Sequence, residues 1–166
     1  MLDIEELFAE NYGGLFRYLV RLTGDSDLAA DVAQETFVRL VEKEPDNKGI
    51  RAWLYRVATN LVRDDARVSR RRIELLQERS SRLPHGDPPR EADVALEVEE
   101  RRRTVRIALD ALGERDRTVL LMREEGFSHQ EIAVAVGTTT KSVGRMIARA
   151  LQKLSAELTL TPDAAE

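Results

Sequence analysis

Cysteine is absent from this chain of 166 residues, and aromatic residues make up only 5% of it. Without thiols the chain forms no disulfide, no thiolate zinc finger and no thiol nucleophile, which fits a reducing compartment. No apolar run approaches the roughly 20 residues that cross a bilayer, and the N-terminal segment MLDIEELFAENY is acidic where a signal peptide is basic. We therefore expect a soluble, cytoplasmic protein without membrane insertion.

The net charge of −4 argues against a nucleic-acid-binding protein, but the distribution of the charges does not. Residues 1–50 hold 11 acidic and 5 basic side chains, whereas residues 51–72 hold 7 arginines and 2 aspartates. Residues 73–100 are acidic again, and residues 101–157 hold 11 bases against 7 acids. Such segregation indicates two basic faces for DNA, an acidic face for a protein partner and an acidic connector.

Residues 128–153 read SHQEIAVAVGTTTKSVGRMIARALQK, which is typical of a helix-turn-helix. Ser128 is suited to cap a short first helix, Gly137 to form the turn, and the small Ala133 to let the two helices approach. The inward positions of the second helix are expected to be Val143, Ile147, Ala150 and Leu151.

The outer face of that second helix carries cations at intervals of four residues, and they wind slowly around it as one stripe. They are Lys141, Arg145, Arg149 and Lys153. A solvated basic face on an ordinary helical hairpin would also explain them. The turn glycine, the small residue and the stripe together favour DNA binding.

Apolar residues at helical spacing predict further helices over residues 4–22, 27–42, 50–72, 92–112 and 116–125. Gly13 and Gly14 are expected to interrupt and bend the first of them. Between the third and fourth, the segment LPHGDPP at residues 83–89 cannot form a stable helix. Positions expected to face inward include Val41, Val94, Leu96, Val98, Val105 and Ile107.

Three segments, in order, resemble parts of the extracytoplasmic-function (ECF) sigma factors, the minimal members of the sigma-70 family with regions 2 and 4 only. Residues 27–40, DLAADVAQETFVRL, resemble the segment that binds core RNA polymerase. Residues 51–61, RAWLYRVATNL, are similar to the promoter-melting helix, and ALDAL at 108–112 leads into the helix-turn-helix. The resemblance implies an all-α protein of two small helical domains joined by a flexible linker. Region 2 would span residues 1–72, the linker 73–96 and region 4 residues 97–158.

The resemblance also assigns roles to the exposed polar residues of the second helix, which a packed core does not need. On charge pattern alone they would be a solvated acidic face. By resemblance this segment binds core polymerase, through the exposed Asp27, Asp31, Gln34 and Glu35 and through the adjoining Thr36 and Phe37.

The third helix suits both single-stranded and duplex DNA. Its arginines neutralise phosphates, Trp53 and Tyr55 offer flat faces to an unstacked base, and Asn60 can read a base edge. Trp53 is equally suited to anchor the core of the three helices. By resemblance, the loop at residues 44–50 holds a flipped base of the −10 element. The expected −10 residues are Lys48, Arg51, Trp53, Tyr55, Arg56, Asn60, Arg63 and Arg67.

The recognition helix departs from the family at Gly144, where many relatives carry a polar side chain. Glycine removes one possible base contact, so the −35 preference is expected to differ from the commonest type. The expected −35 residues are Thr139, Thr140, Lys141, Ser142, Arg145 and Arg149.

The function we infer is that of a sigma subunit that binds core RNA polymerase, reads −35 and −10 elements and opens the duplex. The alternative is a sigma-like adaptor or decoy that binds an anti-sigma partner without starting transcription, but a decoy needs no arginine-rich third helix. A stand-alone repressor is disfavoured, and so is an enzyme, because neither His85 nor His129 lies near a carboxylate pair or a phosphate loop in the sequence. We expect no catalytic residue, metal or cofactor. The expected partners are core RNA polymerase, promoter DNA and an anti-sigma factor.

Overall fold

The structure is a computed structural model that describes residues 2–46, 48–77 and 93–160. Most of these residues are helical, and no strand occurs among them. The first three are α1 (Ile4–Thr23), α2 (Ser26–Lys43) and α3 (Ile50–Gln77). The next four are α4 (Asp93–Asp110), α5 (Glu114–Glu124), α6 (His129–Val136) and α7 (Thr140–Leu160). The expectation of an all-α fold is confirmed.

Local sequence signals explain where these helices begin and end. The Asp25 carboxylate accepts hydrogen bonds from the backbone N–H groups of Asp27 and Leu28, which caps α2. Ser128 and Glu131 form a capping box at the start of α6. Gly24 and Gly137 end α1 and α6 with positive φ angles of 72° and 68°, a conformation that glycine adopts without steric cost.

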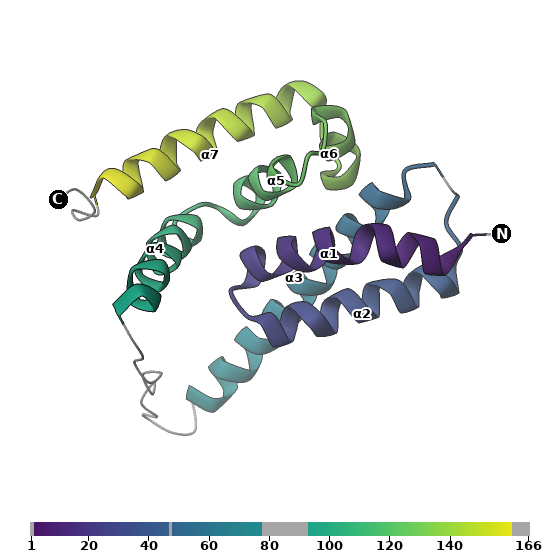
Figure 1. Cartoon of the computed structure of the whole chain (residues 1–166), viewed down its shortest axis with the longest axis horizontal. Helices are drawn as coiled ribbons and strands as arrows, with labels where there is room; N and C mark the ends of the chain where they lie inside the picture. Colours follow the sequence, from purple (N-terminus) through teal and green to yellow (C-terminus); the bar gives the residue numbers. More distant parts are fainter. Residues whose placement is uncertain (1, 47, 78–92, 161–166) are drawn as a thin grey trace.

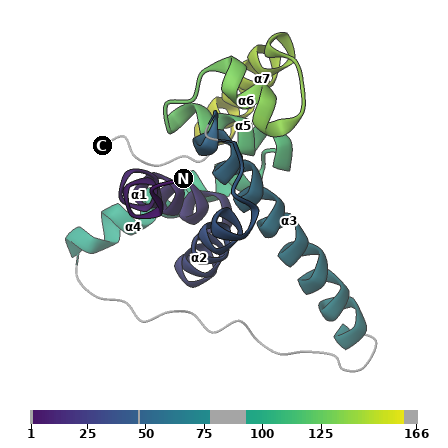
Figure 2. The ribbon, with the colours of Figure 1, turned by 90° about the vertical axis from the view of Figure 1, so that its right-hand side faces the viewer.

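The helices form two bundles, α1–α3 and α4–α7 (Figure 1). The core of the first bundle contains Leu15, Leu19, Phe37, Leu54 and Ala58. The core of the second contains Leu109, Val119, Met122, Ile132, Val143 and Ala150. The bundles are docked on each other, with α1 and α3 of the first against α5 and α6 of the second. In Figures 1 and 2 α2 lies on the side of the first bundle that faces away from α5–α7, and the C-terminal half of α3 projects from the bundle.

The structure corrects several expectations about individual positions. The glycine pair does not interrupt α1, which continues through Gly13 and Gly14. Val41 and Leu151, expected to face inward, are 53% and 50% exposed. Periodicity finds an apolar face, but it does not show whether another element covers that face.

The same correction applies to α4, where only the last turns are packed in the core. Ala108 and Leu109 are buried, and Leu112 just beyond the helix is buried with them. The positions expected to face inward that are exposed instead are Leu96, Val98, Val105 and Ile107. The side chain of Val94 lies outside the described residues.

The segments expected to form the linker are partly helical. Residues 73–77 continue α3 and residues 93–96 begin α4. Residues 83–89, for which the sequence excludes a stable helix, lie outside the described residues. Where the chain is described, no helix is long and apolar enough to cross a membrane.

Candidate nucleic-acid interface

α3 presents two different faces, because its apolar residues recur at helical spacing and its arginines fall between them. Leu54 and Ala58 are fully buried in the first bundle. Five of the expected −10 residues of α3 lie outside this core, and all of them are exposed except the half-buried Arg63. These five are Arg51, Arg56, Asn60, Arg63 and Arg67.

Tyr55 lies at the contact between the bundles instead of on an open face. It is 1% exposed, with its ring centre 4.9 Å from that of Tyr18 in α1 and 4.6 Å from that of Phe127. Burial, together with the nearby Glu125 carboxylate, raises the pKa of the Tyr55 hydroxyl to about 12, while Arg51 opposes the rise. Phe127 therefore packs edge to face with the ring that the sequence assigns to a base.

Arg51 joins the same contact. Its guanidinium carbon lies 4.1 Å from the centre of the Phe127 ring, within cation–π distance. Its Nη2 donates a hydrogen bond to the backbone oxygen of Glu125. Arg51 therefore binds the loop that joins α5 to α6.

Trp53 is half-buried, so one part of its ring contributes to the core and another part is open to a base. It packs against the edge of the core and also lines a cleft of about 380 Å³. Lys48 and Gly49 line that cleft from the first bundle, and Glu131 and Val134 of α6 line it from the second. The loop expected to hold a flipped base therefore lies next to α6; its residue Asn47 is outside the described residues.

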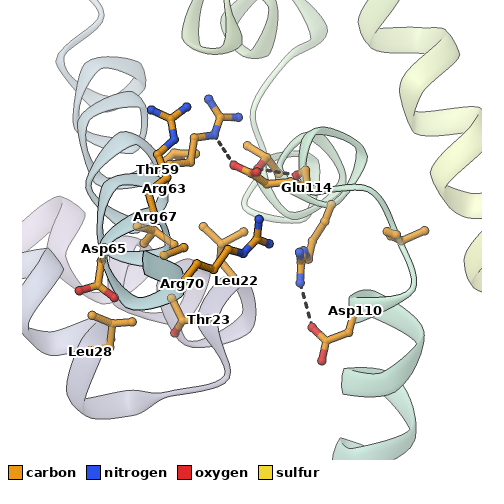
Figure 3. A pocket seen from close by; sticks show the side chains of 15 residues that line it. Leu22, Thr23, Leu28, Thr59, Arg63, Asp65, Arg67, Arg70, Asp110 and Glu114 are labelled. Carbon is orange, nitrogen blue, oxygen red and sulfur yellow. Dashed lines mark hydrogen bonds and ion pairs between the residues drawn. The ribbon is translucent and has the colours of Figure 1, made fainter. Parts of the chain in front are cut away.

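A second cleft, of about 720 Å³, separates the middle of α3 from the α4–α5 junction (Figure 3). Arg63, Arg67 and Arg70 line one side of it. Asp110 and Glu114 line the other, and Arg63 forms an ion pair with Glu114 across the cleft. Basic groups expected to meet phosphates thus face carboxylates of the second bundle.

The helix-turn-helix consists of α6 and α7, joined at Gly137. Burial of Ile132, Ala133 and Val143 holds the two helices together. Hydrogen bonds from the Ser128 backbone N–H and side chain lower the pKa of the Glu131 carboxylate, so the capping box is strongest with this carboxylate ionised. Gly144 of α7 faces His129, and a Cβ added at Gly144 would lie 3.9 Å from the imidazole Nδ1.

The expected −35 residues cluster at the start of α7 and along its outer face. Thr139 Oγ1 accepts a hydrogen bond from the Ser142 backbone N–H at 3.2 Å, as an N-cap residue does. Thr140, Lys141 and Arg145 are exposed and Ser142 is half-buried. The positive end of the α7 dipole adds to the cationic stripe at this end of the helix.

Arg149 is exposed but already has a partner. Its Nε and Nη2 donate hydrogen bonds of 2.8 and 2.5 Å to the two carboxylate oxygens of Asp116 on α5. The Asp116 side chain is 6% exposed, and the hydrogen bonds from Arg149 hold the pKa of its carboxyl below the usual range. This bidentate pair fixes the direction of the Arg149 guanidinium.

The residues expected to bind polymerase divide into an exposed set and a buried set. Asp27, Asp31 and Gln34 are exposed along α2, and Glu35 is exposed while it accepts a 2.9 Å hydrogen bond from Arg39. Thr36 and Phe37 are buried. Phe37 packs in the core, and the Thr36 hydroxyl donates to the Val32 backbone oxygen at 2.7 Å.

Sequence reasoning did not single out the groups that join these surfaces, namely Glu114, Asp116, Glu125 and Phe127. An acid in the first turn of α5 is ordinary helix-dipole chemistry, so Asp116 carried no signal that it meets α7. Phe127 directly precedes the Ser128 cap, where an apolar residue is common, and this signal indicates burial but not its partner. No group of three or more His, Cys, Asp or Glu that could hold a metal occurs among the described residues.

Comparison with known proteins assigns both bundles to one family. The sigma-70 region 2 family matches residues 7–72, and the sigma-70 region 4 family matches residues 102–154. The chain is 34% identical over 164 residues to the ECF RNA polymerase sigma factor SigL of Mycobacterium tuberculosis (strain ATCC 25618 / H37Rv). The aligned residues cover 93% of this chain and 90% of that protein. The chain belongs to the sigma-70 family, as an ECF sigma factor. It therefore directs promoter-specific initiation by RNA polymerase.

Other comparisons agree with this assignment. The sigma factor is 32% identical over 145 residues to the ECF RNA polymerase sigma factor EcfG of Rhodopseudomonas palustris (strain TIE-1), over 85% of this chain and 77% of that protein. Among solved structures, CnrH in complex with the cytosolic domain of CnrY matches with a TM-score of 0.69 at 26% identity, over 95% of this chain and 88% of that one. The sigma factor RpoE of Bartonella quintana, in complex with the anti-sigma factor NepR, shares the fold with a TM-score of 0.74 at 19% identity, over 95% and 97% of the two chains.

Proposed function

We propose that this sigma factor divides its work among three surfaces: the exposed face of α2 for core polymerase, α3 with the loop before it for the −10 element, and α7 for the −35 element. The observation that supports this most strongly is the contrast within the first bundle. One helix exposes acidic and amide groups, and its neighbour exposes a row of arginines together with Asn60. A three-helix bundle needs neither surface for stability.

The polymerase surface consists of the exposed Asp27, Asp31, Gln34 and Glu35. Thr36 and Phe37 are buried, so they contribute by packing α2 in its place in the bundle. The exposed members meet the partner directly. Charged groups at the rim of such an interface mainly set the association rate and the specificity.

The experiment that tests this surface is a binding titration of full-length protein with core RNA polymerase. Replacing Asp31 and Gln34 by alanine together is expected to weaken binding at least tenfold, a loss on the order of 1.4 kcal/mol. The control replaces Glu124 and Gln152 by alanine, which removes one exposed acid and one exposed amide from the second bundle. Equal affinity of the two double variants would refute the assignment.

For the −35 element we propose direct contacts from Lys141 and Arg145, with Thr139, Thr140 and Ser142 near the phosphates at the start of α7. Arg149 is held by Asp116, so we propose that it contacts a phosphate in a fixed direction. Replacing Arg145 by alanine is expected to weaken duplex binding. If Arg145 contacts a phosphate, the slope of log binding constant against log salt concentration should also fall in magnitude by about one unit. An unchanged salt dependence together with altered sequence preference would instead assign Arg145 to a base.

For the −10 element we propose that Lys48, Arg51, Arg56, Arg63 and Arg67 hold the backbone. Trp53, Tyr55 and Asn60 are proposed to meet bases once the duplex opens. We keep the domain limits at residues 1–72 and 97–158, with 73–96 between them. The protein is proposed to work in the cytoplasm, where RNA polymerase acts, and to have no catalytic role; sigma factors in general are not enzymes.

We also propose an anti-sigma partner. The solved structures of RpoE of Bartonella quintana and of CnrH are complexes, the first with the anti-sigma factor NepR and the second with the cytosolic domain of CnrY. The test is affinity capture from native extract, followed by addition of the captured protein to a transcription assay with this sigma factor. Inhibition supports the proposal. A chain that captures a partner but starts no transcript would favour the adaptor or decoy.

A further inference from the structure

α4 carries apolar residues on a side that its own bundle leaves uncovered. Leu109 is buried in the core of the second bundle, and Val105 lies one turn before it on the same side of the helix. Leu96 and Ile107 lie on the opposite side, three turns apart, and are 36% and 56% exposed. The N-terminal half of α4 points away from α5 and α6 (Figures 1 and 2). A solvated helix side is normally polar, so this one indicates a partner outside the bundle.

Two charged residues lie between these apolar residues on the same side. Leu96, Glu100, Arg103 and Ile107 follow one another at intervals of four, three and four residues, which places them in one row along the helix. All four are exposed. Neither Glu100 nor Arg103 takes part in the ion pairs formed among the described residues. We call this row the α4 stripe.

The α4 stripe is complementary to a second copy of itself that runs antiparallel. Leu96 and Ile107 are equally far in sequence from the midpoint of the stripe, and so are Glu100 and Arg103. A two-fold axis at that midpoint therefore sets each Leu96 against Ile107 of the second copy and each Glu100 against Arg103 of the second copy. A parallel copy would instead place like charges opposite each other.

The charges along the rest of α4 favour the same orientation. The first half of the helix contributes acids, and the second half contributes mostly bases: Glu97, Glu99 and Glu100 in the first, and Arg101, Arg102, Arg103 and Arg106 in the second. Asp110, the acid at the end of the second half, forms ion pairs with Arg106 and Arg117 of its own chain. Antiparallel pairing lays the acidic half of each copy over the basic half of the other, and such complementarity selects partner and register.

We propose that this protein forms a homodimer in which the α4 stripes of two copies pack antiparallel. One pair of short helices buries a small area, at the low end of specific interfaces, so the dimer exchanges with monomer. The stripe includes none of the residues assigned to polymerase, the −10 element or the −35 element. The inference therefore does not rest on the proposed function.

The first test is sedimentation equilibrium of the full-length protein at low salt. The weight-average mass is expected to rise from 18.8 kDa toward twice that value between roughly 10 μM and 1 mM protein, the range of a weak complex. Ile107→Asp is expected to stay monomeric, because it removes the apolar contact with Leu96. Val98→Asp is the matched control: it makes a similar change on the same helix, at a residue that is 49% exposed on the other side.

A monomeric unaltered protein throughout this range would overturn the proposal, and so would equal association of the two variants. A monomeric protein whose binding to core polymerase is weakened by Ile107→Asp would assign the stripe to polymerase instead and likewise overturn the dimer.

The second test exchanges charges, and it separates lost pairing from lost folding. Glu100→Arg and Arg103→Glu each place like charges opposite each other twice in the dimer, so each is expected to weaken association at least about tenfold at low salt. The double variant Glu100→Arg, Arg103→Glu restores both pairs with reversed polarity and is expected to regain association. A double variant no better than the single ones would overturn the pairing.

The third test fixes the orientation and uses the absence of cysteine from the chain. Residues 96 and 107 are about 16 Å apart along one helix, too far for a disulfide within one copy. Mild oxidation of Leu96→Cys, Ile107→Cys is therefore expected to give a covalent dimer. Leu96→Cys alone is expected to give none, because its two thiols are equally far apart in the antiparallel pair. Equal crosslinking of the single and double variants would overturn the antiparallel arrangement.

Discussion

Gly13 and Gly14 are neighbours in α1, but alanine is expected to act on them in opposite ways. A Cβ on Gly13 would come no closer than 3.8 Å to Arg17 Nη1, which is ordinary contact. A Cβ on Gly14 would lie 3.0 Å from the Tyr55 hydroxyl and 3.4 Å from Glu125 Oε2. Tyr55 cannot move aside, because its ring is packed between Tyr18 and Phe127.

The magnitudes follow from these distances. Glycine to alanine inside a helix gains about 0.5–1 kcal/mol when the new methyl group fits. Gly13→Ala is therefore expected to stabilise the protein by that amount. At Gly14 the same gain is opposed by an overpacking cost of about 1–3 kcal/mol, so Gly14→Ala is expected to be neutral or destabilising by up to about 2 kcal/mol.

Thermal and urea unfolding followed by far-UV circular dichroism measure the difference. The two variants should be separated by about 1–3 kcal/mol, or several degrees in melting temperature at about 2–4 °C per kcal/mol. Acrylamide quenching of Trp53, the chain's single tryptophan, should rise in Gly14→Ala and stay unchanged in Gly13→Ala. A Gly14→Ala protein as stable as Gly13→Ala, with unchanged quenching, would refute the docked arrangement of the bundles.

Three further predictions concern single groups. Tyr18→Phe should cost about 0.5–1.5 kcal/mol in urea unfolding, because the buried Tyr18 hydroxyl bonds to Thr59 Oγ1 at 2.8 Å while Thr59 gives its own proton to the Tyr55 backbone oxygen; no loss would contradict this bond. Gly144→Ala should stabilise the protein by about 0.5–1 kcal/mol, since its Cβ meets only ordinary contact with His129, and a destabilised variant would show that α6 and α7 pack more closely than described. Asp116 has a lowered pKa in the folded protein, so the stability it provides is present above its unfolded pKa of about 3.9 and is lost as the pH falls through the lower folded value. The stability difference between the unaltered protein and Asp116→Asn should therefore shrink as the pH drops below about 4, and a constant difference would exclude the ion pair as its source.

Helix positions in this sigma factor were predictable because capping and apolar spacing are local. The predicted limits of the first two helices differ from those of α1 and α2 by no more than one residue at each end. Ser128 and Gly137 marked α6 correctly for the same reason. The predicted interruption of the first helix at Gly13 and Gly14 was wrong, because α1 continues through both glycines. At Gly14 the Tyr55 side chain of α3 comes close to the backbone of α1, which local propensity does not reveal.

The docking of the two bundles could not be predicted from the sequence. Arg17 and Glu125 are 108 residues apart, and each alone is an ordinary charged residue near a helix end. The exposed apolar residues of α4 were misassigned for a related reason, since amphipathic spacing is the same whether or not a partner covers the face. The residues expected to contact DNA and polymerase stay predictions, and the structure adds which of them are engaged within the chain.

Promoter selection is tested by transcription from sheared genomic DNA of the source organism, with core RNA polymerase and mapping of transcript 5′ ends. With this sigma factor present, we expect new and discrete start sites that share two upstream sequence elements. The same core enzyme saturated with an unrelated sigma factor confirms that it is active. Start sites identical to those of core enzyme alone would mean that this protein does not select promoters.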